Sequence, residues 1–319
     1  MGEFELIEQY FNLHREQTGV DIGIGDDCAV LSIPPNTQLA VSIDTLVEGT
    51  HFLSETAPEQ LASRLIGAAA SDLAAMGATP AWLTLSLCLP DADENWLAAF
   101  AQRLHEECRT LGLHLVGGDT TKGPLVLTAQ VHGYVAQQQA LTRHGAREGD
   151  YICVSGTLGD SRAGLAIQLN ELDSHSIAPV DKDYLLNRFF RPTPRIALGQ
   201  ALVSKANACI DISDGLLADL THILSASDLG AQLDLSQLPI SSSLVASVSD
   251  VQTRQAWALS GGEDFELCFT LPKSMATPQF LNALPTPVTI IGEVCRELGI
   301  HTAQPLPDCF GFDHFKKDT

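Results

Sequence analysis

The sequence predicts an α/β protein of the α+β kind with two domains, on three observations. Its 319 residues exceed the usual size of one domain. Apolar residues make up 45% of the chain and charged residues 18%, which is enough for a sizeable core. Both halves mix strand-like alternation with helical periodicity, and the polar residues 136–149 separate them. We therefore expect one domain over residues 1–136 and a second over residues 150–319.

The first elements alternate between strand and helix. Residues 38–43 predict a short buried strand that ends at Asp44. Residues 59–76 predict a helix, because leucine or alanine recurs every four residues and Gly77 follows as a cap. Residues 82–89 alternate leucine with other residues, which is the pattern of a half-buried strand.

The first half then repeats this order. Apolar residues at helical spacing predict a helix over about residues 96–111 that stops at Gly112. Short strands should flank a turn at residues 117–119, and residues 125–135 should form a long strand. This alternation of strands and helices favours packed α and β layers.

The second half has the same two periodicities, with polar residues around Pro179 that predict a loop. The expected elements are strands at residues 151–154, 208–212, 231–235, 265–271 and 288–294, and helices at about 160–172, 194–206 and 216–225.

The charge balance limits the possible partners. Acidic residues outnumber basic residues 39 to 18, for a formal net charge of -21. Such a surface repels the phosphate backbone, so we expect no nucleic acid partner. The chain has neither a basic start followed by an apolar run nor 18 consecutive apolar residues. We therefore expect a cytoplasmic protein without a membrane segment.

Aspartates recur where predicted elements meet polar or glycine-bearing turns. One such aspartate is usually a turn or helix-cap residue, and Asp214 could simply cap the helix that follows it. Asp72 is more informative, because it interrupts an apolar helix, where a carboxylate needs a cation or a donor. Together these residues indicate loop oxygens for magnesium. They lie in the segments GIGDD (residues 23–27), DT (44–45), SDL (71–73), GGDTT (117–121) and DISDG (211–215).

The usual nucleotide-binding motifs are missing from the sequence. There is no G-x-x-x-x-G-K-[ST] phosphate loop and no H-R-D or D-F-G pair of a protein kinase. The GIG segment lacks the third glycine of a dinucleotide fingerprint. A nucleotide site in this chain would depend on carboxylate-bound metals and a few basic side chains.

Eight segments between residues 23 and 315 carry a family resemblance. They are GIGDDCAVL, IDTLVEGTHF, SDLAAMGATPAWLTLSLCLP, LVGGDTTKGPL, LTRHGAREGD, IDISDGLLADL, WALSGGEDFELCFT and GFDHF. By these segments, in this order, the chain resembles the thiamine-monophosphate kinase family. The resemblance implies the two-domain fold of aminoimidazole ribonucleotide synthetase, whose N-terminal domain pairs strands across a homodimer, with ATP in the cleft between the domains.

The resemblance also implies the metal and nucleotide contacts. Gly118, Asp119, Arg143 and Ser213 would meet the phosphates of ATP, with Asp119 acting through metal and Ser213 through its hydroxyl or its amide. Ile43 stands where many relatives carry threonine, so its contact would be preserved only through the backbone oxygen. Several Mg2+ ions are implied, with these ligands: Asp27, Ser42, Ile43, Asp44, Asp72, Asp119, Asp211 and Asp214.

The acceptor, thiamine monophosphate, would contact three further residues by the same resemblance. These are His51, Glu263 beside two glycines, and Phe312, whose ring could stack on a flat heterocycle. Without the resemblance, His51 would be interpreted as a surface histidine or a hydrogen-bonded core histidine, and Arg143 as a solvated loop residue. Phe312 could equally well serve core packing of the C-terminal tail. We expect His51 to position the acceptor rather than to abstract a proton.

The expected reaction is direct in-line transfer of the γ-phosphoryl group from ATP to thiamine monophosphate, giving thiamine diphosphate. Both substrates are anions, so the main barrier is electrostatic. The metals together with Asp72, Asp119 and Arg143 are therefore the predicted catalytic elements. No strong base is needed, because the accepting phosphate oxygen is already deprotonated.

Other functions use the same fold or the same composition. Aminoimidazole ribonucleotide synthetase and selenophosphate synthetase are the nearest, but the segment before Gly23 lacks the reactive cysteine and lysine of the latter. A non-catalytic acidic scaffold that binds cations is the alternative of another class. It would have no need for the segment GGED at residues 261–264 or for the Phe312 tail.

Overall fold

The structure is a computed structural model that describes residues 2–12, 17–307, 311–312 and 315. The chain divides into two compact units: residues 1–73 with 78–139, and residues 74–77 with 140–319. Each unit has its own sheet. Among the described residues, no helix combines the length and the apolar character required to cross a bilayer.

The first unit contains a four-stranded sheet in the order β3-β6-β4-β5. The β3–β6 and β6–β4 pairs are antiparallel, and β4–β5 is parallel. A short hairpin, β1–β2, follows an N-terminal helical segment. The elements are α1 (Glu3–Leu6), η1 (Ile7–Phe11), β1 (Val20–Ile22), β2 (Val30–Leu31), β3 (Thr37–Val47), α2 (Pro58–Ala75), β4 (Thr79–Leu89), α3 (Glu94–Leu111), β5 (His114–Lys122) and β6 (Val126–Ala136).

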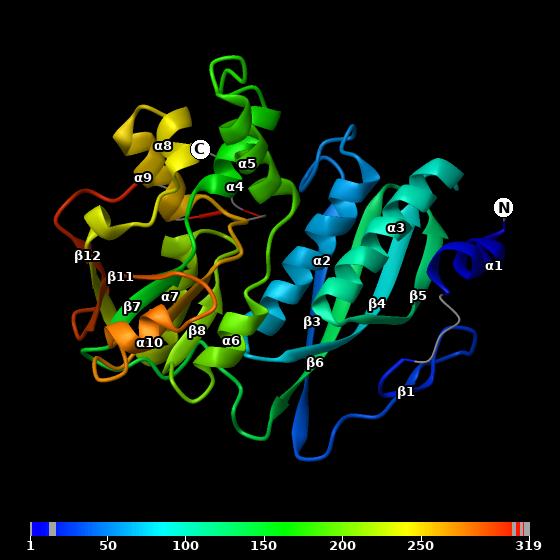
Figure 1. Cartoon of the computed structure of the whole chain (residues 1–319), viewed down its shortest axis with the longest axis horizontal. Helices are drawn as coiled ribbons and strands as arrows, with labels where there is room; N and C mark the ends of the chain where they lie inside the picture. The colour runs from blue at the N-terminus through cyan, green and yellow to red at the C-terminus, as the bar shows by residue number, and fades with distance from the viewer. Residues whose placement is uncertain (1, 13–16, 308–310, 313–314, 316–319) are drawn as a thin grey trace. The chain divides into compact units, whose positions relative to one another are not determined.

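Helices α2 and α3 lie side by side on one face of this sheet (Figure 1). The leucines of β4 are buried, while Thr84, Ser86 and Cys88 between them are only half-buried, as the alternation predicts. Helix α3 ends at Gly112, whose φ of 73° is the left-handed geometry of a glycine cap. The helix and strand predictions for residues 59–76, 82–89 and 96–111 are confirmed.

Two boundary predictions in the first unit are wrong. Strand β3 does not end at Asp44 but continues to Val47, because residues 37–47 pair with β6 along their whole length. Residues 117–119 are not a turn but part of β5. A Cβ on Gly118 would lie 1.8 Å from the Leu85 carbonyl oxygen, so this glycine serves the close approach of β5 to β4 rather than a turn.

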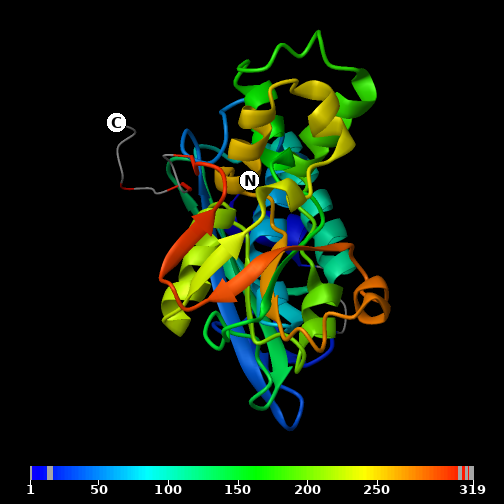
Figure 2. The same ribbon diagram turned by 90° about the vertical axis from the view of Figure 1, so that its left-hand side faces the viewer.

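The second unit contains a six-stranded sheet in the order β12-β9-β11-β7-β10-β8. Its pairs are antiparallel except β12–β9. Figure 2 shows β9, β11 and β12 adjacent on the near side of this unit. The strands are β7 (Tyr151–Ser155), β8 (Ala208–Asp211), β9 (Gly230–Leu233), β10 (Leu267–Leu271), β11 (Val288–Cys295) and β12 (Gly299–Thr302).

Apolar clusters cover both faces of the second sheet. One joins Ile152, Val154 and Ile210 to helix α7, and the other joins Cys153 and Phe269 to α6 and α10. The helices are α4 (Asp160–Gln168), α5 (Pro179–Phe190), α6 (Ile196–Leu202), α7 (Leu216–Ser227), η2 (Leu235–Gln237), α8 (Ser242–Ser247), α9 (Val251–Ser260) and α10 (Pro278–Asn282).

The helix α5 replaces the loop that was predicted around Pro179. Proline is the first residue of this helix, a position where its missing N–H is no loss, so it starts the helix instead of breaking it. The sequence analysis also missed α9 and β12. The mixed α/β fold itself is confirmed.

Candidate functional site

Three predicted metal ligands come together in the first unit. Ser42 and Asp44 are two residues apart on β3, so their side chains leave the same face of the sheet. The Ser42 hydroxyl donates a hydrogen bond to the Asp72 carboxylate on α2. The packing of α2 on the sheet therefore brings Asp72 close to Ser42 and Asp44.

The electrostatics of this group suit a cation. The pKa of Asp44 is raised to about 6, mainly by burial and in smaller part by the nearby Asp72 carboxylate. A divalent ion between the two carboxylates would remove this repulsion. Hard oxygens of carboxylates and a hydroxyl are also the donors that Mg2+ prefers.

Gly118 and Asp119 lie elsewhere on the same sheet. Asp44 on β3 is opposite Ala129 on β6, which is opposite Leu85 on β4, which is opposite Gly118 on β5. Asp119 on β5 is opposite Ser86 on β4. Three strand spacings of ~4.8 Å separate β3 from β5 by roughly 14 Å. Among the residues with described positions, no three His, Cys, Asp or Glu side chains surround one ion position. The first unit thus offers separate positions rather than a single acidic cluster.

Three other predicted residues occupy different places in the first unit. Asp27 lies in an exposed bend, where its amide donates to Asp26 Oδ1 at 2.9 Å. Ile43 is 59% exposed, and its side chain leaves the opposite face from Asp44, so only its carbonyl could join that group. His51 Nδ1 accepts a hydrogen bond from the Val47 amide at 3.0 Å. This bond assigns the proton of the neutral ring to Nε2, which suits a donor and not a base.

In the second unit, residues 211–215 comprise the end of β8 and the loop that leads to α7. Asp211 is the last residue of β8 and is buried. The Asp219 carboxylate accepts the amides of Ser213, Asp214 and Gly215 at 3.0 to 3.1 Å. These amides are therefore not available to a phosphate, and Ser213 can offer only its hydroxyl.

The sequence analysis did not identify Asp219, although its position four residues after Gly215 would have allowed it. A carboxylate in the first turn of a helix commonly accepts the amides before it. Burial raises the pKa of Asp219 to about 7, with Asp214 contributing and the amide donors opposing the rise.

Two predicted acceptor residues contact the same loop. The Glu263 amide donates to the Ser213 carbonyl at 2.7 Å, and the Phe312 amide donates to the Asp214 carbonyl at 3.1 Å. A Cβ on Gly262 would lie 2.7 Å from the Ser213 carbonyl oxygen, so only glycine permits this approach. Phe312 is 53% exposed, and its ring is not part of the core.

Arg143 belongs to the segment that leads into the second unit. The neighbouring Thr142 carbonyl accepts a hydrogen bond from the Cys209 amide at 2.8 Å, which fixes the segment along β8. Arg143 itself is exposed. Its neighbour Thr142 bonds to Cys209, two residues before Asp211, and an exposed arginine next to this bond could meet a bound anion.

A buried ionic network in the second unit was also missed. Glu266, with 0% exposure, accepts from Ser155 Oγ at 2.6 Å, Arg188 Nη2 at 3.0 Å and Arg195 Nε at 2.7 Å. Asp264 accepts from the amides of two residues at the start of α4. The segment GGEDFE was singled out only for Glu263, because sequence gives no sign of which acids are buried.

Asp264 gives this network a predicted pH dependence. Burial raises its pKa from 3.8 to about 7, Asp160 adds to the rise, and Arg188 and the two amides oppose it. Between pH 4 and 7 the unfolded chain loses this proton before the folded chain does, so the free energy of unfolding should fall as pH rises through that range. Urea titrations of wild type and Asp264→Asn at several pH values should diverge there. Parallel curves would contradict the assignment.

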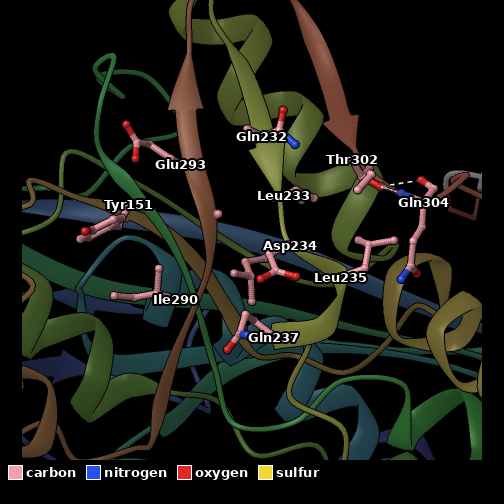
Figure 3. A pocket seen from close by; sticks show the side chains of 13 residues that line it. Tyr151, Gln232, Leu233, Asp234, Leu235, Gln237, Ile290, Glu293, Thr302 and Gln304 are labelled. Carbon is pink, nitrogen blue, oxygen red and sulfur yellow. Dashed lines mark hydrogen bonds between the residues drawn. The ribbon is translucent and has the colours of Figure 1, made fainter.

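A hollow of about 480 Å3 lies on the second unit, and the residues that line it do not include any predicted site residue that the structure describes (Figure 3). Its lining includes Gln232, Gln237, Gln304, Asp234 and Glu293, and among the described residues no arginine, lysine or histidine contributes to it. Asp234 caps η2, and Glu293 pairs with Lys273 at 2.7 Å. This lining does not suit a phosphate, so the hollow is not a candidate for the nucleotide.

Both halves of the chain are similar to known proteins. Residues 25–135 match the family model of the N-terminal domain of AIR synthase related proteins, and residues 147–301 match that of the C-terminal domain. A protein of Escherichia coli (strain K12), named thiamine-monophosphate kinase, is 49% identical over 322 residues, which cover 98% of each chain.

Two solved structures have the same fold. The crystal structure of thiamine-monophosphate kinase from Stenotrophomonas maltophilia K279a is 40% identical, with a TM-score of 0.87, and the match covers 95% of this chain and 97% of that one. The complex of AaThiL with AMPPCP and TMP is 32% identical, with a TM-score of 0.80, and covers 98% and 97% of the two chains.

Proposed function

The chain belongs to the thiamine-monophosphate kinase family, and we propose on this basis that it transfers a phosphoryl group from ATP to thiamine monophosphate. The product is thiamine diphosphate. The observation that carries this conclusion is the 49% identity that extends over 98% of both chains. The complex of a relative with AMPPCP and TMP supports the same two substrates, since AMPPCP is an analogue of ATP.

The first unit is the proposed metal-binding part. Ser42, Asp44 and Asp72 fit a magnesium ion by donor type, by proximity and by the raised pKa of Asp44. Bound Mg2+ would neutralise charge on the transferring phosphoryl group. Asp119 is proposed for a second position on β5, with Gly118 beside the phosphates. Asp27 and the Ile43 carbonyl complete the ligands proposed for this unit.

The second unit is the proposed source of ligands for the remaining ions and for the acceptor. Asp211 and Asp214 supply carboxylates, and the Ser213 hydroxyl meets a phosphate, because the loop amides are engaged by Asp219. Glu263 and Phe312, which both bond to this loop, form the acceptor surface for a cationic, flat ring system. Arg143 supplies a positive charge to the phosphates, and His51 of the first unit donates its Nε2 proton to the acceptor.

The proposed mechanism is direct in-line transfer without a phospho-enzyme. Two unit charges of the same sign 4 Å apart repel each other by ~4 kcal/mol at an effective dielectric of about 20, so charge neutralisation dominates the barrier. The protein groups then orient the two phosphates, and an already ionised phosphate oxygen attacks. No side chain has to act as a strong base.

A coupled assay tests the proposed function. Thiamine diphosphate should form from thiamine monophosphate only when ATP and Mg2+ are present. The melting temperature should rise with thiamine monophosphate and rise further with AMPPCP and Mg2+, because ligands stabilise the folded state that binds them. Absence of both product and thermal shift would refute the function and favour a non-catalytic cation-binding protein.

We further propose a homodimer that forms through the face of the first sheet opposite α2 and α3, where strand β3 is exposed. Three apolar residues of edge strand β3, Leu39, Val41 and Ile43, are 47% to 59% exposed on that face. Such a row on an edge strand favours association. Sedimentation should give a mass of twice 34.1 kDa for wild type, and Val41→Asp should shift it towards the monomer. A wild-type monomer would contradict this.

A further inference from the structure

The segment that carries Glu263 has an uncommon backbone. Glu263 and Phe265 both have positive φ values, 64° and 50°, although neither is glycine. Side chains disfavour this left-handed region, and a bulky residue such as phenylalanine disfavours it strongly. Two such residues separated by a single position persist only where the surroundings fix the backbone.

Asp264, the residue between them, is fixed at both its side chain and its backbone. Its carboxylate accepts the Gly159 amide at 2.7 Å and the Ser161 amide at 3.2 Å. Its carbonyl accepts Arg188 Nη2 at 3.0 Å, and the same Nη2 donates to Glu266. Asp264 is 1% exposed and Arg188 is 8% exposed, so water does not compete for these bonds.

The two flanking residues are fixed by the loop after β8. The Glu263 amide bonds to the Ser213 carbonyl and the Phe265 amide bonds to the Ile212 carbonyl, at 2.7 and 2.9 Å. Residues 263–265, which we name the acidic turn, are therefore held against the Asp211–Asp214 loop on one side and against α4 and Arg188 on the other.

We infer that Asp264 and Arg188 are positioning residues, which hold the acidic turn in its left-handed conformation and so place Glu263 for the acceptor. The inference rests on the proposed role of Glu263. Stability alone does not call for a buried acid and arginine, because replacing such a pair by well-packed apolar residues often costs no stability. Here Arg188 donates to the backbone of the acidic turn, at the Asp264 carbonyl, and the Asp264 carboxylate ties the turn to the amides of Gly159 and Ser161.

The test uses Asp264→Asn and Arg188→Lys in the full chain. Asparagine keeps one acceptor oxygen but places an NH2 where the second amide donates, and lysine cannot reach both acceptors of the arginine. Hydrogen exchange at the Glu263 and Phe265 amides should accelerate about tenfold in both variants, without a change at β7 and β10. The KM for thiamine monophosphate should rise about tenfold, and the KM for ATP should stay within about twofold.

Two comparisons separate positioning from general stability. Asp250→Ala, which removes the cap of α9, should lower the melting temperature but leave the KM for thiamine monophosphate unchanged. Asp264→Asn combined with Glu263→Gln should be no worse than Glu263→Gln alone, because the turn would then have no carboxylate to place.

Unchanged exchange at the two amides would overturn the inference, and so would faster exchange with an unchanged KM, or additive effects in the double variant. If Asp264→Asn does not fold, Arg188→Lys decides by the same measurements. If wild type forms no thiamine diphosphate, the proposed function fails on its own, and hydrogen exchange still decides whether these two residues hold the turn.

Discussion

Asp72→Asn is expected to lower kcat by about 10²- to 10³-fold while the protein remains folded. Asp72 is the carboxylate of α2 that the Ser42 hydroxyl bonds and that raises the pKa of Asp44. Asparagine can still accept the bond from Ser42, so the local structure should be retained. What it lacks is the negative charge that would hold Mg2+ beside the phosphates.

The melting temperature of Asp72→Asn without Mg2+ distinguishes loss of metal binding from loss of folding. Removing one of two neighbouring carboxylates relieves repulsion, so the melting temperature without Mg2+ should be equal to or above that of wild type. Asp91→Asn, at an exposed aspartate of the same unit, is the matched control and should be fully active. If Asp72→Asn had the same kcat as wild type at limiting Mg2+, Asp72 would not be a metal ligand.

Glu266→Ala is expected to cause the largest loss of stability, about 3–5 kcal/mol. The substitution removes the acceptor for Arg188 and Arg195 and leaves their charges in a buried site. For a unit of this size, that loss corresponds to a fall in melting temperature of roughly 10 °C. Calorimetry in the absence of ligands gives this value directly.

The matched control for Glu266 is Glu148→Ala. Glu148 pairs with Arg296 at 2.6 Å, but both side chains are more than half exposed, so its loss should change stability by less than about 1 kcal/mol. If the two variants had equal melting temperatures, the buried Glu266 network would contribute no more to stability than the exposed ion pair of Glu148.

Periodicity predicted most of the elements that build the two sheets. The β4 strand followed from its alternation, because its leucines are buried and the residues between them are half-buried. The α2 helix followed from its apolar four-residue spacing, although the structure buries it on nearly all sides from residue 61 to residue 75. Prediction from sequence failed where one residue type is common in two kinds of local structure. Pro179 starts a helix although it resembles a loop residue, and Gly117 and Gly118 lie in a strand although they resemble a turn.

The site was predictable only in part. An aspartate in an apolar helix drew attention to Asp72, and the family resemblance supplied the other residues that are proposed as ligands. Sequence could not indicate that the amide of Ser213 is engaged by Asp219, or that Asp264 and Glu266 are buried. These facts depend on contacts between residues far apart in the chain, such as Gly159 with Asp264.

The central claim is that the carboxylates of this acidic chain bind divalent cations beside bound nucleotide. The most direct measurement is Mn2+ binding, followed by electron paramagnetic resonance, in wild type and Asp72→Asn saturated with AMPPCP. The account predicts more than one bound ion per chain in wild type and at least one fewer, or a much weaker one, in the variant. The same number of ions bound with the same affinity in both proteins would contradict it.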